Sequence, residues 1–533
     1  MAPSPNIRNL RFGDMLEQYR MRVEEHLLRK DEELLIRLDD VIAFHEELLK
    51  KMTTERGLLY TNIWERRSLK APMRTLPTEL VQKILLLACV DEEATWSDRP
   101  VYPVALFGRL AKILPNDLAG VCARWHHIVY DTPQFWEALT VKVPRSESQK
   151  NRLQQILDRS RSRPLSLSIQ RGSWYQGVSS TRFIAPLRQA MSRASELHID
   201  YDFIAEEYLG EEMEYSALKS LSLYMRGSYG VTERYPFSSS QLRLLIRAPA
   251  LESFWTDSFR EMANHSLFPS DTITEFACGQ GGILGQEDVS KVFGNCPRIR
   301  VISITLKPSS QRPDGSSKPL VLHHLERLTY SSDGPRTIAF LDSLTTPSLQ
   351  ELNLPLDAPS NVHQHFVQFL ERSRCSLRTL GCTLPRELTA DPSGWGTILS
   401  RLHDLDTLRV RVSGSQTWSG KSSFDILCDV LSTDVPTLRK LKCFQVTAHG
   451  GDWRDLQTSE MDGVMRRWVI FAESRSPQHH KSKVVPLRKT RLQFDSNRTW
   501  SDSPDVSISA DLKERRELLV SAGMECELFL PFD

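Results

Sequence analysis

Residues 349–354 read Leu-Gln-Glu-Leu-Asn-Leu, so leucines stand at the first, fourth and sixth positions of a six-residue stretch. The whole pattern or part of it, with other apolar residues in some positions, recurs along most of the chain. The recurring stretches begin at Leu197, Leu218, Leu251, Ile273, Ile299, Leu325, Leu349, Leu377, Leu405 and Leu438. From Leu218 onward, successive stretches begin 22 to 33 residues apart. One structural unit is therefore repeated many times.

An apolar core of this form, repeated every ~20 to 29 residues, is typical of a leucine-rich repeat. One unit cannot bury its leucines alone, whereas neighbouring units in register bury them in a continuous core. The sequence therefore predicts an α/β fold in which residues 141–533 form an irregular leucine-rich-repeat solenoid with a curved parallel sheet. The usual asparagine after the core is mostly missing, which predicts distortion of the repeats. The alternative is an ordinary α/β domain with leucine-rich strands.

Apolar residues at helical spacing predict helices between the strands and after the last of them. These helices are residues 362–373, 424–431, 461–474 and 512–520. With a strand at 524–530, the last helix is expected to cap the array, because a solenoid otherwise exposes its final core layer. Residues 476–489 are polar and basic, which favours a solvated loop; a nuclear localisation or acidic-partner site is the alternative.

Residues 1–70 are predicted to form a separate helical segment. Between Met15 and Arg67 the sequence has no proline, one glycine and many Glu, Lys, Arg and Leu residues. Its apolar positions step by three and four, with a histidine and an arginine as interruptions. These positions are Leu35, Leu38, Ile42, His45, Leu49, Met52, Arg56, Leu59 and Ile63. The helix could form a dimeric coiled coil, or fold against the next segment or its own N-terminal half.

Residues 71–140 contain two amphipathic stretches. The first begins at Leu76-Pro77, because proline is pre-set in φ for the first turn of a helix, and Thr75 is a candidate cap. Leu80, Ile84 and Leu87 then fall on one helical face. A second face has the same helical spacing and consists of Leu118, Val121, Cys122, Trp125 and Ile128. Both faces must be buried on each other or on a partner.

Read together, these stretches are Leu-Pro-x-Glu-Leu-x-x-x-Ile-Leu, then Leu-x-x-Val-Cys-x-x-Trp-x-x-Ile, then Phe-Trp-x-x-Leu. Over about 65 residues this resembles an F-box, the helical module that docks substrate receptors on the Skp-type adaptor of a cullin ubiquitin ligase. The spacer at 88–117 is longer than usual, and we expect it to be a loop with a short central helix. With its flanking segments, the chain resembles the large F-box families of mushroom-forming fungi.

The resemblance implies that the F-box contacts the adaptor through its apolar residues. The implied adaptor-binding residues are Leu76, Pro77, Leu80, Ile84, Leu118, Val121, Cys122 and Trp125. Periodicity alone supports a different interpretation, in which these residues are plain core and Trp125 is a buried indole whose loss would cost about 3 to 5 kcal/mol.

Composition excludes several functional classes. Hydrophobic residues make up 40% and charged residues 25% of the chain, and the formal net charge of +1 gives no bulk attraction to nucleic acid. Nine scattered cysteines without a C-x-x-C pair predict reduced thiols. No stretch reaches the ~20 apolar residues of a membrane span. We expect a cytoplasmic or nuclear protein that binds neither nucleic acid nor membrane.

Catalytic and cofactor motifs are not found in the sequence. The glycine-rich stretch from Gly279 to Gly285 lacks the spacing of a phosphate loop and is expected to be a turn between repeats. His363 and His365 could offer two metal ligands, but no cysteine or carboxylate set completes a site, and we expect surface histidines. The sequence therefore predicts a non-enzyme without metal or cofactor.

The leading hypothesis is a substrate receptor of a Skp-cullin-F-box ubiquitin ligase, with the repeats holding an unknown protein. In a leucine-rich array, residues between the core leucines alternate outward. Those expected to line one surface are Ser222, Ser303, Thr329, Asn353 and Arg409, and the candidate substrate-binding residues are Tyr224, Tyr330 and Arg409. The alternative is a repeat scaffold outside any ubiquitin ligase.

Overall fold

The structure is a computed structural model, and it forms two compact units, Met1–Ile84 and Leu85–Asp533. The residues that it describes are 12–69, 72–89, 115–142, 147–170, 181–200, 214–224, 247–256, 271–279, 292–305, 320–331, 334–355, 362–384, 392–414, 427–429, 431, 440–450, 458–476, 487–496 and 510–529. Most of the spacer at 88–117, the glycine-rich stretch after Gly279 and most of the basic loop lie outside them.

The first unit consists mainly of α1 (Phe12–Leu69), a single uninterrupted helix of 58 residues. The side chains described along it are all exposed, including Leu35, Ile42 and Leu49 of the expected seam. The alternative in which this segment doubles back on its own N-terminal half is therefore wrong. Dimerisation through the seam stays a prediction.

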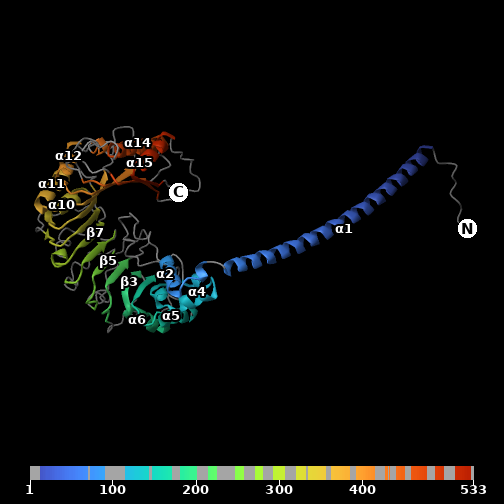
Figure 1. Cartoon of the computed structure of the whole chain (residues 1–533), viewed down its shortest axis with the longest axis horizontal. Helices are drawn as coiled ribbons and strands as arrows, with labels where there is room; N and C mark the ends of the chain where they lie inside the picture. The colour runs from blue at the N-terminus through green and yellow to red at the C-terminus, as the bar shows by residue number, and fades with distance from the viewer. Residues whose placement is uncertain are drawn as a thin grey trace. The chain divides into compact units, whose positions relative to one another are not determined.

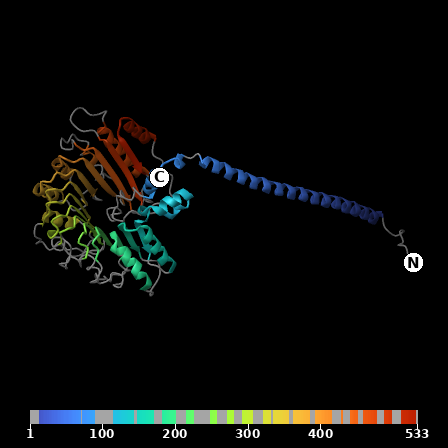
Figure 2. The same ribbon diagram turned by 60° about the horizontal axis from the view of Figure 1, so that its bottom comes forward.

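The second unit is organised by one parallel sheet of 14 strands, whose order in space follows the order in the chain. The strands are β1 (Ala138–Lys142), β2 (Leu165–Gln170), β3 (Ala194–Asp200), β4 (Ser220–Tyr224), β5 (Ser253–Thr256), β6 (Glu275–Cys278), β7 (Val301–Thr305), β9 (Arg327–Ser331), β11 (Glu351–Pro355), β12 (Thr379–Leu384), β13 (Thr407–Gly414), β14 (Cys443–Gly450), β15 (Lys489–Ser496) and β16 (Glu525–Phe529). Figure 2 shows them side by side in this sequence. The predicted leucine-rich-repeat solenoid is confirmed.

Helices lie in several of the segments between the strands. They are α5 (Glu147–Arg159), α6 (Thr181–Ser192), α10 (Gly334–Ser343), α11 (Val362–Ser373), α12 (Pro392–Arg401), α14 (Thr458–Ser474) and α15 (Ala510–Ser521). In Figure 1, α10, α11 and α12 lie on the outer side of the curved sheet. A short parallel pair, β8 (Leu320–Val321) and β10 (Leu344–Thr345), accompanies them. Helices and strands enclose one continuous apolar core, which the repeated leucines fill.

The register of the last repeats differs from the prediction. Phe444 of β14 pairs with Leu408, so the first leucine of this unit is Leu441 rather than Leu438. Because leucines stand three residues apart here, the sequence allowed two registers. Only the observed register buries the aromatic ring of Phe444. The next strand, β15, was not predicted, because its unit reads Leu487-x-x-Thr490-x-Leu492. Thr490 fills the central core position and is fully buried.

The predicted second helix of residues 71–140 is broken in two. It consists of α3 (Pro115–Ala119) and α4 (Ala123–Asp131), separated by a turn in which Val121 N donates to Leu118 O. Cys122 has extended backbone angles and occupies the N-cap position of α4, without a side-chain hydrogen bond to the helix. The apolar face counted across this break does not exist as one helical stripe.

Candidate functional site

The outward face of the sheet carries the side chains that alternate with the buried leucines. At one level of this face, Ser303, Thr329, Asn353, Gly381 and Arg409 follow one another on neighbouring strands. The expected alignment of these outward positions is confirmed by the strand register. Such a row is a flat array of side chains on a rigid sheet, which suits contact with a partner.

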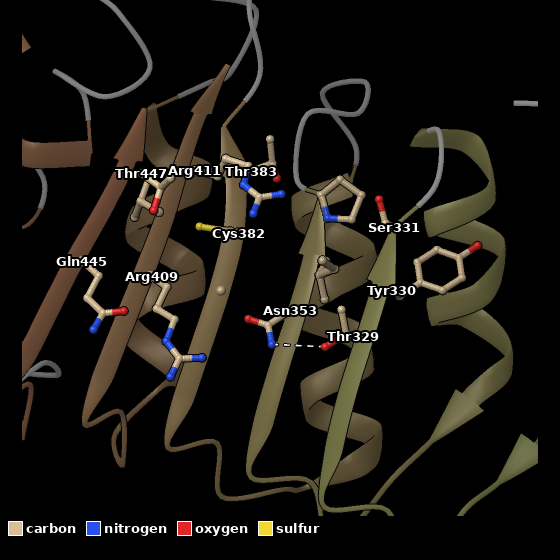
Figure 3. Close-up of a pocket in the computed structure, with 14 residues that line it drawn as sticks. Thr329, Tyr330, Ser331, Asn353, Cys382, Thr383, Arg409, Arg411, Gln445 and Thr447 are labelled. Carbon is tan, nitrogen blue, oxygen red and sulfur yellow. Dashed lines mark hydrogen bonds between the residues drawn. The ribbon is translucent and has the colours of Figure 1, made fainter. Parts of the chain in front are cut away.

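A hollow of about 210 Å³ lies in this face, across β9 to β14 (Figure 3). Its lining residues are Thr329, Tyr330, Ser331, Asn353, Leu354, Pro355, Gly381, Cys382, Thr383, Arg409, Val410, Arg411, Gln445 and Thr447. Gly381 of β12 creates the space, because it has no side chain at an outward position between Asn353 and Arg409. A Cβ at Gly381 would stand 1.8 Å from Oδ1 of Asn353, so that amide already leans over the glycine.

Polar contacts fix the side chains beside the glycine. Nδ2 of Asn353 donates to Oγ1 of Thr329 at 3.3 Å and to Oε1 of Glu351 at 3.3 Å. Nη1 of Arg409 donates to the same Glu351 oxygen at 2.9 Å, although β12 lies between their strands. Because Gly381 has no side chain, Arg409 can extend across β12 to Glu351. Arg409 is therefore held in place at the hollow.

One of the three predicted substrate-binding residues, Tyr330, is placed differently from the prediction. Tyr330 was expected to be exposed, but it is buried and its ring stacks on Phe340 with centroids 4.3 Å apart. Tyr330 pairs in the register with Ile304, which occupies a core position. Figure 3 shows the ring of Tyr330 directed away from Arg409. The side chain of Tyr224 lies outside the described part of the chain. Tyr330 and Arg409 both border the hollow, but of these two only Arg409 occupies an outward position of the sheet.

Sequence reasoning missed Gly381, Arg411 and Gln445. A glycine inside a predicted strand signals close approach of another group, and this signal was present at Gly381. Arg411 is two residues after Arg409 on β13, so the alternation of a strand places it on the same face.

The thiol of Cys382 is not a candidate nucleophile, because burial raises its pKa to about 12 and it stays protonated at neutral pH.

At the N-terminal end of the sheet, the same face is closed. His198 of β3, Ser222 of β4 and Trp255 of β5 occupy outward positions in register with one another, yet all three are buried. Burial lowers the pKa of His198 to about 4, against a smaller opposing effect of Glu196. The open part of the face therefore lies towards the C-terminal strands.

His198 makes the stability of the second unit depend on pH. Its folded pKa is below the unfolded value of 6.5, so the unfolded chain binds more protons between about pH 4 and 6.5, and stability rises with pH there. We expect about 2 kcal/mol less stability at about pH 5 than at about pH 7.5 from this group. Urea unfolding at both values should show a smaller difference for His198→Asn. An equal difference in both proteins would contradict the burial of a neutral imidazole.

The predicted adaptor-binding residues of the first half lie at the start of α2 (Thr78–Cys89). Pro77 precedes the helix, and its carbonyl accepts the first hydrogen bond, from Val81 N at 3.2 Å. The predicted helix start is confirmed, but Thr75 is not its cap, because Oγ1 of Thr75 donates to Pro72 O at 2.8 Å. Leu76 is half-buried and Pro77 is exposed.

Exposed and buried apolar residues alternate around α2. Leu80, Ile84 and Leu87 have exposed fractions of 48, 42 and 58%, whereas Val81 and Leu85 are buried. The helix therefore presents an apolar stripe to solvent in addition to the one that it buries.

Four further predicted residues belong to α3, α4 and the turn between them. Leu118 is buried, Val121 and Cys122 are exposed, and Trp125 is half-buried. The buried indole of this region is Trp136, in the short 3₁₀ helix η5 (Pro133–Trp136). The interpretation of Trp125 as a fully buried core residue is wrong.

Metal ligands do not gather in the part of the chain that the structure describes, where no group of three or more His, Cys, Asp or Glu side chains could hold an ion. His363 is buried beside Trp395, with ring centroids 5.6 Å apart, so the expectation of a surface histidine is wrong there. Nδ1 of His365 lies 2.8 Å from Oδ1 of Asp342. None of the described helices is long and apolar enough to span a membrane.

Comparison with known proteins gives little beyond the fold. No family model matches the sequence, and no curated protein matches it significantly. Among solved structures, the chain is similar to the leucine-rich repeat-containing protein LegL7 from Legionella pneumophila, with 12% identity over 72% of this chain and 97% of that chain and a TM-score of 0.32. At that distance the fold assignment rests on the sheet itself.

Proposed function

We propose that this protein is a non-catalytic substrate receptor of a Skp-cullin-F-box ubiquitin ligase. Residues 71–140 dock on the Skp-type adaptor, and the open part of the outward face holds the protein to be ubiquitinated. The receptor acts by proximity, since fixing a substrate near the charged ubiquitin carrier raises its effective concentration without a nucleophile of its own.

The observation that carries this proposal is the exposed stripe of α2. Leu80 and Ile84 follow a Leu-Pro helix start at the spacing of the F-box pattern, Leu87 continues the same helical face, and all three remain in solvent. Exposed apolar residues gathered on one helix face are typical of an interaction site. The sequence resemblance supplies the identity of the partner. The exposure of these side chains supports their availability for contact with that partner.

The outward face supports the second half of the proposal. It is a long row of mixed polar side chains on a rigid sheet, with a hollow at Gly381, and it carries Arg409, a residue type enriched in binding hot spots. A protein partner matches such a surface better than a polyanion does, because acidic and basic residues alternate along it, as in the pairs Arg327–Glu275 and Lys489–Glu527.

Co-purification tests the proposal. The full chain, co-expressed with a Skp-type adaptor and a cullin, should elute with both in one complex from a size-exclusion column. Separate elution of the chain and a folded adaptor would contradict it. That result would favour the alternative, a leucine-rich-repeat scaffold that binds protein partners outside a ubiquitin ligase.

A further inference from the structure

We infer that the hollow over Gly381 binds one anionic side chain of a peptide segment, a carboxylate or a phosphate, between Arg409 and Arg411. This inference rests on the proposed function only in taking the outward face as the substrate surface. It adds the chemical class of the group that is recognised.

The size of the hollow favours a single side chain. Its volume of about 210 Å³ is below the ~300 Å³ at which sites for small molecules and cofactors usually begin. It lies on an extended sheet surface, so a polypeptide could lie across the strands and insert one residue. The depression exists because Gly381 has no side chain.

The charge of the lining favours an anion. Arg409 and Arg411 stand two residues apart on β13, about 7 Å along the strand, and both line the hollow (Figure 3). The fourteen lining residues include no carboxylate, while the hydroxyl groups of Thr383 and Thr447 and the amide of Gln445 add donors. Guanidinium groups bind carboxylate and phosphate oxygens with paired, charge-assisted hydrogen bonds.

Hydrogen bonding at Arg409 is incomplete without a ligand. Its Nη1 donates to Glu351, whereas its Nε is buried and has no hydrogen-bond partner among the residues that the structure describes. Buried donors are normally satisfied, so this Nε can take an acceptor from a bound group. An anionic oxygen entering over Gly381 would supply that acceptor.

Carboxylates surround this hollow on the described part of the face. The carboxylate of Glu351 lies directly beside it, and Glu527 lies on the same face with Lys489 and Arg491. A long polyanion crossing the strands would meet these carboxylates. One isolated acidic or phosphorylated residue in a peptide would not.

Fluorescence anisotropy with the full chain and short degenerate peptide pools tests this inference. The pools differ only in a central glutamate, phosphoserine, glutamine, serine or lysine. We expect binding of the glutamate pool, the phosphoserine pool or both to be about tenfold tighter than that of the neutral and lysine pools. The stronger of the two identifies the anion. Equal binding of the neutral pools would overturn the inference.

Two variants and a matched control locate the site. Gly381→Ala should force the Asn353 amide into the hollow, and Arg411→Gln should remove one charge while keeping polar contacts; both should lose the preference for the anionic pool. Arg327→Gln makes the same charge change on the outward face outside the hollow and should keep the preference. Unchanged binding in the first two variants, with unfolding temperatures like that of the wild type, would overturn the inference. Adaptor co-purification of the same proteins reports separately on the ligase.

Discussion

Substituting aspartate for both Leu80 and Ile84 is expected to abolish binding of the Skp-type adaptor. Each side chain is exposed in the free protein and would be buried by the adaptor, so each contributes about 2 kcal/mol of apolar burial to the complex. Losing both weakens the affinity by about a thousandfold, before the cost of burying two carboxylates is counted. Titration calorimetry or pull-down with purified adaptor measures the loss.

Exposure of these side chains makes the test specific. Because Leu80 and Ile84 contact solvent, their replacement should change the unfolding temperature only slightly. Lys83→Asp places a carboxylate on an exposed, polar position of the same helix and should leave binding within severalfold of the wild type. Replacing Leu76 and Pro77 with alanine should also prevent binding, by removing an apolar anchor and a pre-set helix start together. Unchanged adaptor binding by the aspartate variant would refute the F-box assignment.

Trp136→Ala is expected to destabilise the second unit by about 3 to 5 kcal/mol. The indole is only 4% exposed, and its Nε1–H donates to Val129 O at 3.0 Å. The guanidinium of Arg159 on α5 lies 4.7 Å from its ring centroid and 4.0 Å from that of Tyr130. Trp136 thus connects α4 to the first helix of the repeats, and its removal leaves a cavity where they meet.

Trp125→Ala is the matched comparison for this prediction. Trp125 is half-buried, so we expect roughly 1 to 2 kcal/mol of destabilisation, less than for Trp136. Urea unfolding of the two variants, followed by far-UV circular dichroism, gives both values. A larger loss for Trp125 would mean that it, and not Trp136, anchors this part of the core.

The fold could be predicted because the repeats carry their signal in many independent places. Each unit places apolar residues at fixed intervals, and ten approximate copies specify a parallel sheet even when single copies are ambiguous. The prediction failed for the repeat that contains β15, because the polar composition of that repeat hid its apolar pattern. At Thr490 a hydroxyl residue fills a core position, and its neighbours Lys489 and Arg491 read as a basic loop.

The site was harder to predict because it depends on what a position lacks. Arg409 was identified from its outward position, whereas the hollow exists only because Gly381 has no side chain between it and Asn353. Tyr330 was misassigned because large aromatic residues suggest hot spots, although its place in the repeat is that of a core leucine. Position within the repeat, rather than residue type, decided which side chains reach the surface.

The neighbour-by-neighbour order of the sheet has a consequence for synthesis on the ribosome. In the 14-stranded sheet, each strand from β2 to β16 pairs with a strand that was translated before it, so a partner is already in place when it emerges. Among the described strands, β1 and β8 must wait for a later strand, β2 and β10 respectively. The chain can therefore fold progressively from its N-terminal side during translation, with each new repeat closing the exposed core of the last.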